Sequence, residues 1–280
     1  MSTNRRPGRR SGVSLVELLV AMTLLGIVGL SILRTFTSQA RLADLQTKRL
    51  DARAVSRAPI NLFMSEARMV ETGNGVVAAT SSSVTLRIPV VMGLVCGSSG
   101  ASTVLSLMPV DSAMLASAAI SGHAYRQPSG VYSYTEASTA VSSYGGLACN
   151  NESITTVSGG TMVAVTPQMV GAEVGTVAFL YQRVRYDFAA STAMSGRVGL
   201  WRTLEASGAT EEIAAPFDAT SRFRYYRADQ DTVDTGVPTL TAIRGIRLEL
   251  VGASERNRFG KLTPETSQLQ TAVFFMNRLQ

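Results

Sequence analysis

The sequence predicts an α+β fold in which a long N-terminal α-helix, membrane-spanning in its first part, packs on an antiparallel β-sheet domain. Three observations support this prediction. Residues 13–33 are almost purely apolar, residues 35–72 are amphipathic and free of glycine, and after Gly75 short runs alternate between apolar and polar residues. At 280 residues, the chain has room for this helix and one globular domain of ordinary size.

The basic charge of the chain is concentrated at its start. The formal net charge is +6, and four of the 26 Lys and Arg side chains lie among the first ten residues. Without residues 1–12, which contain no acid, 22 basic side chains face 20 acidic ones. The remainder has no long basic run with interleaved aromatic residues, so no direct nucleic-acid partner is expected.

The apolar run at residues 13–33 has the length of a membrane span, which takes about 20 predominantly apolar residues. The apolar region of a secretory signal is shorter, roughly 7 to 15 residues. The arginines before the run would hold that end in the cytoplasm and place the rest of the chain outside. A plain signal anchor fits these observations but leaves Glu17 unexplained, because a carboxylate at the centre of a span costs about 3 kcal/mol and usually pairs with another group.

Cleavage after Gly12 would provide a partner for Glu17. The new amine at Val13 lies four residues away, one helical turn, although the amine of a neighbouring subunit would satisfy the acid equally well. Residues 12–20, GVSLVELLV, resemble the prepilin signal of type IV pilins and type II secretion pseudopilins. The resemblance implies that residues 1–12 are a leader removed by prepilin peptidase, that the amine of Val13 is methylated and that Glu17 docks the subunit into a filament. Val13 stands where this family most often has phenylalanine, although other apolar residues occur there.

The helix is expected to continue beyond the membrane, with residues 13–34 as its transmembrane part and residues 35–72 as its amphipathic part. Residues 13–72 would form a helix about 90 Å long. Pro59 predicts a kink or a short break, because proline lacks a backbone donor and clashes with the preceding turn. Gly73 and Gly75 are expected to end the helix.

An extracytoplasmic β-rich domain is expected over residues 73–280. Residues 76–79 and 84–88 predict a hairpin, with Pro89 at a strand edge or strand end. Residues 90–165, rich in Gly, Ser, Ala and Thr, predict an irregular insertion, whose aromatic residues and cysteines argue against a disordered linker. Short strands within it are expected at residues 104–107 and 131–134.

The only two cysteines, Cys96 and Cys149, fall within this insertion. A disulfide between them is the expected state outside the cytoplasm, and it would stabilise the domain by about 3 to 4 kcal/mol. The alternative is a pair of buried thiols. A redox or zinc site is not expected, because the spacing is not CxxC and His123 is the sole histidine.

The C-terminal third has the clearest strand pattern. In residues 183–188 and 244–250, apolar side chains alternate with charged ones, so one face of the sheet should meet a core. The arginines on the other face are expected to be mostly solvated. The predicted strands are residues 176–188, 197–205, 222–227, 242–250 and 269–277.

The order of these strands resembles the C-terminal half of J-type minor pseudopilins of type II secretion and of W-like minor pilins of type IV pilus assembly. The length of the chain favours a minor subunit too, since major subunits are usually shorter. Arg34 also stands about where major pilins commonly have a helix-kinking proline. The matching segments are residues 184–186, 198–202, 223–226 and 243–248.

These resemblances imply a minor pilin or pseudopilin, a structural subunit assembled at the tip of a type IV pilus or type II secretion pseudopilus to prime assembly. The partners they imply are prepilin peptidase, other minor pilins or pseudopilins, the inner-membrane assembly platform and membrane lipid. The expected location is the bacterial inner membrane, as a single-pass protein with a cytoplasmic N terminus and a periplasmic domain, and then the filament tip. The alternative function is a membrane-anchored extracytoplasmic binding or adhesion protein.

No catalytic chemistry is expected from the sequence. The chain has one histidine, no P-loop and no dinucleotide-binding glycine motif after a strand, so neither an enzyme activity nor a cofactor is expected. Asp229, Asp231 and Asp234 form an oxygen-rich segment of the kind that holds calcium. Their spacing misses the EF-hand pattern, so a solvated acidic loop is expected there and no metal site is assigned.

Overall fold

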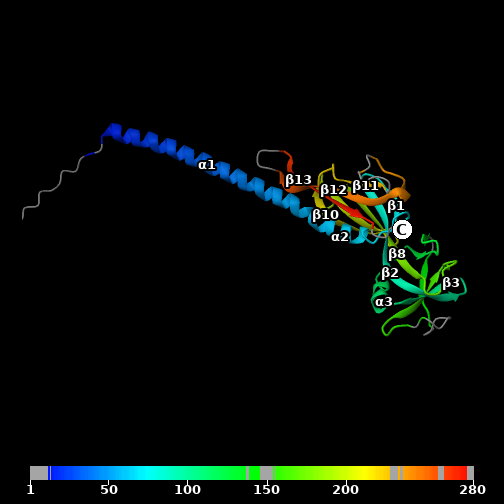
Figure 1. The fold of residues 1–280 in the computed structure, drawn as a ribbon. Helices are drawn as coiled ribbons and strands as arrows, with labels where there is room; N and C mark the ends of the chain where they lie inside the picture. Colours follow the sequence, from blue (N-terminus) through cyan, green and yellow to red (C-terminus); the bar gives the residue numbers. More distant parts are fainter. Residues whose placement is uncertain are drawn as a thin grey trace, which may run out of the picture.

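The computed structural model describes residues 12, 14–136, 139–145, 154, 156–227, 233, 236–257 and 262–275. A long helix projects from a β-domain, and the first part of the helix stands clear of that domain (Figure 1). The predicted α+β fold, with an N-terminal helix packed on a large antiparallel sheet, is confirmed.

The helix is interrupted near Pro59, as its sequence predicts. Helix α1 spans Leu15–Val55 and α2 spans Arg57–Ala67, with a turn at Ser56 between them. The position of the break follows from Pro59, which has no N–H for the carbonyl four residues earlier, at Val55.

The helix ends before its predicted limit at Thr72. Arg68 caps α2, and the chain then turns so that Val70 and Glu71 enter the protein interior, where they are 0% and 2% exposed. Burial of these two side chains against the sheet therefore overrides the helical pattern of the sequence.

The predicted hairpin is confirmed as β1 (Val76–Ala79) paired antiparallel with β2 (Ser83–Ser99). Of the two alternatives for Pro89, a strand edge or a strand end, the strand end is wrong, because β2 continues through Pro89. The register against the neighbouring strand shifts between Pro89 and Val91, which marks a bulge or irregularity where a residue without an N–H is tolerated.

Residues 90–165 were expected to be an irregular insertion that contains short strands, and their described part is more regular than that. They form a compact distal lobe, the part of the domain farthest from α1 (Figure 1). Its core contains Val91, Leu105, Val165 and Leu180, and the frequent Ser, Thr and Ala residues between such positions hid the pattern. The strands predicted at residues 104–107 and 131–134 are confirmed within it. The elements of this lobe are β3 (Ser102–Leu107), α3 (Pro109–Leu115), β4 (Gly122–Arg126), β5 (Tyr132–Thr135), β6 (Ala140–Ser143) and β7 (Thr161–Thr166).

The five C-terminal strands are confirmed with shifted ends, and a sixth, β10, was not predicted because it is rich in Ala and contains Pro216. All pairings in the sheet are antiparallel, and its main path runs β11-β12-β10-β9-β8-β2-β3-β7-β6. The remaining elements are β8 (Val177–Ala190), β9 (Val198–Leu204), β10 (Ala209–Phe217), β11 (Arg222–Arg227), the short 3-10 helix η1 (Leu240–Ala242), β12 (Ile243–Asn257) and β13 (Pro264–Phe274).

The junction of α1 and α2 packs closely on the sheet. Phe63 of α2 is fully buried, and its ring lies 5.2 Å from that of Tyr186 and 5.8 Å from that of Phe223. Gly252 of β12 lies directly under α1, so that a Cβ at this position would stand 2.0 Å from the carbonyl oxygen of Ala52. The absence of a side chain at Gly252 is what lets the two backbones approach.

A buried ion pair joins α2 to the sheet. Arg202 Nη2 donates to Glu66 Oε1 at 2.7 Å, with both side chains less than one-fifth exposed, and the hydroxyl of Tyr186 donates to Glu66 Oε2. Burial raises the pKa of Tyr186, and the negative charge of Glu66 raises it further. These contacts keep the Glu66 carboxylate satisfied although it is largely removed from water.

The arginines predicted to be mostly solvated are partly exposed and paired with acids. Arg185 is half exposed and lies 3.1 Å from Asp187, whereas Arg183 lies 2.8 Å from Glu205 with 30% of its side chain exposed. Such partly exposed pairs stabilise a fold by about 1 kcal/mol or less. Their contribution is mainly to keep this face of the sheet polar.

The distal lobe and the rest of the β-domain, which packs against α1 and α2 and is called the helix-side lobe, share the strands β2 and β8. The helix-side ends of these strands contribute Leu86 and Tyr186 to one core, and the distal ends contribute Val91 and Leu180 to the other. Each lobe therefore continues into the other through one antiparallel pair, whose register shifts once, between Pro89 and Val91.

Polar contacts also join the lobes. Tyr134 of the distal lobe donates its hydroxyl to the buried carboxylate of Glu71 at 2.9 Å, and Arg87 lies 4.8 Å from the centre of the Tyr134 ring. Burial raises the pKa of Glu71, whereas the hydrogen bond from Tyr134 opposes that rise. The connection after α2 is thereby fixed to the β4–β5 hairpin.

His123 makes the stability of the distal lobe dependent on pH. The side chain is fully buried, its Nδ1 lies 3.2 Å from Thr139 Oγ1, and its Nε2 has no hydrogen-bond partner among the described residues. Burial lowers the pKa of His123 to about 4, below the value near 6.5 of an unfolded chain. The unfolded state therefore binds the proton first, and stability falls as the pH drops from about 6.5 towards 4.

We expect the wild-type domain to lose about 2 kcal/mol more than a His123→Gln variant between pH 7.5 and pH 4.5, because the variant cannot take up this proton. Urea unfolding of the full chain in detergent, monitored by far-UV circular dichroism at both pH values, measures the difference. Equal losses in both proteins would contradict a buried neutral histidine.

Candidate functional site: the N-terminal processing segment

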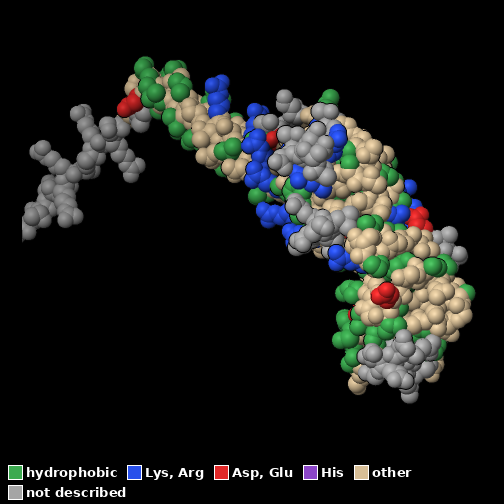
Figure 2. Space-filling model, turned by 45° about the vertical axis from the view of Figure 1, so that its right-hand side comes forward, with side chains coloured by type: hydrophobic (Ala, Val, Ile, Leu, Met, Phe, Trp, Pro, Cys, Tyr) green, Lys and Arg blue, Asp and Glu red, His purple; other side chains and the backbone are tan. Residues whose placement is uncertain are grey.

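The first half of α1 is an apolar surface that no other part of the described chain covers. From Leu15 to Phe36 its large apolar side chains are 49% to 80% exposed, and they form the green surface at the free end of the helix (Figure 2). The helix is long and apolar enough to cross a membrane. Exposure on all sides suits a helix that is surrounded by lipid or by other helices.

Glu17 lies in the first turn of this helix and is exposed. Ser14 caps the helix with an extended backbone conformation, and its carbonyl accepts the amide of Leu18 at 3.1 Å. An acid in the first turn interacts favourably with the free N–H groups at the helix start. Gly12, two residues before the cap, is exposed, and Val13 lies outside the described residues.

The same segment matches a known family. Residues 7–33 match the family model described as the prokaryotic N-terminal methylation motif. This N-terminal segment is that of a type IV pilin-like prepilin. No curated protein and no solved structure matches the chain. The family to which the motif belongs is structural rather than enzymatic.

The motif and the exposed apolar helix together fit a membrane-anchored prepilin. They also imply that prepilin peptidase processes the chain and that the product assembles with other pilins. Within the helix, Gly26 and Gly29 have no other atoms near the position that a Cβ would take. Any close packing at these glycines therefore involves a helix from another molecule.

The other residues singled out from the sequence lie mostly outside the described residues. Cys96 is fully buried in the distal lobe, but Cys149 is outside the described residues, so their disulfide stays a prediction. Asp229, Asp231 and Asp234 are also outside them. Among the residues that are described, no group of His, Cys, Asp and Glu side chains is placed to hold a metal ion.

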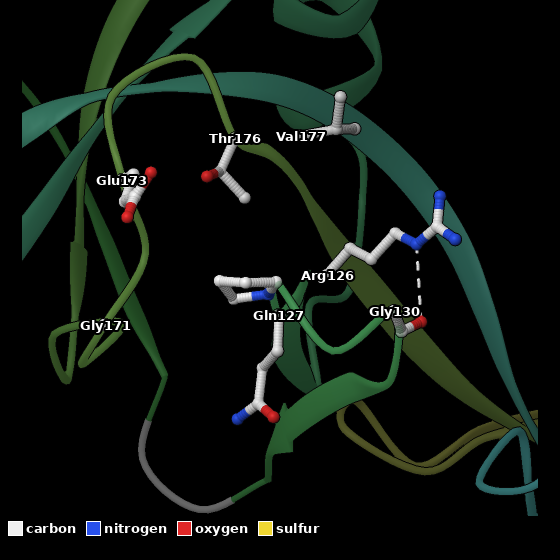
Figure 3. A pocket seen from close by; sticks show the side chains of 8 residues that line it. Arg126, Gln127, Gly130, Gly171, Glu173, Thr176 and Val177 are labelled. Atoms are coloured by element: carbon white, nitrogen blue, oxygen red, sulfur yellow. Dashed lines mark hydrogen bonds between the residues drawn. The ribbon is translucent and has the colours of Figure 1, made fainter.

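Two adjoining hollows lie on the distal lobe and meet at Val177. One has a volume of about 420 Å³ and lies between the turn after β4 and the loop that precedes β8. In Figure 3, Glu173 and Arg126 lie on opposite sides of it, and Arg126 Nε donates to the carbonyl of Gly130 at 3.3 Å. The second is an apolar hollow of about 240 Å³, whose lining includes Met92, Leu94, Met108, Ile154, Val157 and Val177.

The sequence did not predict the contacts through which the helix packs on the sheet. Gly252 offered a signal, because a glycine inside a strand pattern often marks the close approach of another backbone. Glu66 and Arg202 offered none, since each appears as an ordinary charged residue in an amphipathic run. Their pairing depends on a contact between segments far apart in the chain.

Proposed function

We propose that this prepilin is a minor pilin or pseudopilin that is assembled at the tip of a type IV pilus or type II secretion pseudopilus and primes assembly. The observation that carries the proposal is the methylation motif at residues 7–33 on a helix whose apolar half is exposed on all sides. Such a helix is soluble in a bilayer and can later pack among other helices in a filament core. The length of the chain and the order of its C-terminal strands support a minor subunit.

In this proposal, prepilin peptidase cuts between Gly12 and Val13 on the cytoplasmic side and the amine of Val13 is methylated. The globular domain lies on the periplasmic side. Glu17 then pairs with a positive N-terminal amine, either its own or that of a neighbouring subunit. The pairing removes the cost of an isolated carboxylate in an apolar environment, and it links processing to assembly.

Mass spectrometry of the mature protein tests the processing step. In cells with an active prepilin peptidase, we expect the first residue to be N-methylvaline at Val13, with residues 1–12 absent. A Gly12→Val variant is the matched control, because it keeps the charge and apolar character of the segment and blocks the cut. A wild-type chain that still begins at Met1 would rule out the proposal.

The alternative is a membrane-anchored binding or adhesion protein, and the apolar hollow on the distal lobe favours it. Met92 and Met108 on its lining are 55% and 53% exposed, and such flexible apolar side chains suit a surface that takes a ligand. Deletion of the gene separates the two functions. Loss of the filament or of secretion supports the tip subunit, whereas intact filaments with loss of attachment support the binding protein.

A further inference from the structure

Basic side chains gather on the part of the molecule that follows the apolar half of α1 (Figure 2). Residues 34–57 contain six basic and two acidic side chains, a formal charge of +4. Residues 90–176, which include most of the distal lobe, contain one basic and four acidic side chains, a formal charge of −3. The charge is therefore polarised along the molecule, and its positive end adjoins the membrane span.

Three of these basic residues lie along one face of α1. Arg34, Arg41 and Lys48 are spaced by seven residues, or about two helical turns. Arg34 and Arg41 are exposed and Lys48 is partly exposed. Arg34 directly follows Leu33, and at 1.5 Å per residue Arg41 lies about 12 Å and Lys48 about 22 Å beyond Leu33.

The start of β13 also lies at the end of the domain that faces the membrane span. Arg49 Nε lies 3.0 Å from Glu265 Oε1, and Thr271 Oγ1 lies 3.7 Å from Met64 Sδ, so β13 runs in the same direction as the helix. The start of β13 is therefore its end nearest the membrane. Leu262, three residues before Glu265, lies about 10 Å nearer to the span than Arg49, or about 14 Å beyond Leu33. Its side chain is 95% exposed.

We propose that this end of the domain, formed by Arg34, Arg41 and Leu262, docks on the anionic lipid headgroups of the membrane that α1 spans. The headgroup layer extends about 5 to 7 Å beyond the hydrocarbon on each side. Its electrostatic field reaches about 8 to 10 Å further. Arg34 then lies within the headgroups, and Arg41 and Leu262 lie within their field. A span tilted by about 20° towards the start of β13 brings Leu262 closer still.

Lipid fits this surface better than an acidic protein does. The basic residues begin at the first residue after the span, and the opposite end of the molecule has a net negative charge that an anionic surface would repel. An exposed leucine at the same end of a domain as basic residues is also the combination that interfacial anchors use. Docking would hold the domain in one orientation against the bilayer before assembly and would be released when the subunit leaves the membrane. The inference rests on the membrane insertion proposed above.

The test uses the full chain in vesicles of phosphatidylcholine alone or mixed with phosphatidylglycerol. A fluorescent amino acid replaces Thr263, next to Leu262, and a quencher is attached to a constant fraction of the headgroups. We expect stronger quenching in the anionic vesicles, and a return to the phosphatidylcholine level at molar salt. Arg41→Gln should lower the ratio of docked to undocked domain by about fivefold. The matched control, Arg126→Gln, removes the same charge from the distal lobe and should have no effect.

Equal quenching in the two kinds of vesicle, or an equal effect of Arg41→Gln and Arg126→Gln, would overturn the inference. Quenching that does not depend on lipid charge, and rises only when other membrane proteins are added, would also overturn the inference, since that result identifies a protein partner. Extraction of the vesicles at alkaline pH distinguishes failure of this inference from failure of the proposed function. If the chain is extracted, it was not inserted, and the proposed membrane insertion fails. If the chain stays inserted and its quenching does not depend on lipid charge, only the docking inference fails.

Discussion

A Gly252→Val variant is expected to lose about 3 kcal/mol or more of unfolding free energy and to release α1 from the sheet. A Cβ at this position would stand 2.0 Å from the carbonyl oxygen of Ala52 and 2.9 Å from Ser56 Oγ. The nearer contact is with backbone, so no change of side-chain rotamer can relieve it. The strand cannot shift either, because Gly252 pairs with Phe217 of β10 on one side and with Ser267 of β13 on the other.

Chemical unfolding of the full chain in detergent measures the loss, and limited proteolysis near Ser56 reports release of the helix. Gly145→Val is the matched control, because no atom lies within 4 Å of the position that its Cβ would take. We expect the control to stay within about 0.5 kcal/mol of the wild type. A Gly252→Val variant that is equally stable would show that the helix does not depend on this close approach.

Replacing Glu17 with alanine is expected to leave membrane insertion intact, or to improve it slightly, while lowering incorporation into filaments by at least about tenfold. Insertion improves because an isolated carboxylate is costly in a bilayer. Assembly suffers because the positive amine that Glu17 would neutralise is left unpaired inside an apolar helix bundle. The opposite signs of the two effects distinguish docking from a general defect in the helix.

Immunoblots of membranes and of sheared filaments, from cells that express each variant, give both quantities. Thr23→Val is the control, since Thr23 is a polar residue on the same exposed helix, and its hydroxyl donates to the carbonyl of Val20 at 2.9 Å. It should insert and assemble as the wild type does. Normal assembly of the Glu17→Ala variant would show that the acid has no docking role.

The sequence was most informative where a single segment determines the structure. The apolar run, the break near Pro59 and the β1–β2 hairpin each follow from neighbouring residues, and all three are confirmed. The methylation motif is equally local, since its glycine, acid and apolar helix lie within residues 7–33. For these features the local preference of the chain and its tertiary environment agree.

The sequence was least informative where contacts between distant segments determine the secondary structure. The distal lobe looked irregular because its core residues are separated by Ser, Thr and Ala, and only the pairing of β3 with β2 and β7 shows that they share one interior. Pro89 was expected at a strand edge or a strand end, but β2 continues through it, and the register irregularity beside it accommodates the missing donor. Strand β10 was missed because its alanines have little intrinsic preference for a sheet, and the strand is held by its neighbour β9 instead.

The continuity of β2 and β8 through both lobes also determines how the molecule would bear mechanical load. A force applied between a helix anchored in a filament and an object held by the distal lobe would pass mainly through these two strands, whose pairing runs from Ser83↔Asp187 to Leu94↔Val177. Both backbones cross from one lobe to the other side by side, so the two strands bear the tension in parallel, and no flexible linker extends first along this path. A subunit built in this way would transmit tension from the helix to the distal lobe with little extension.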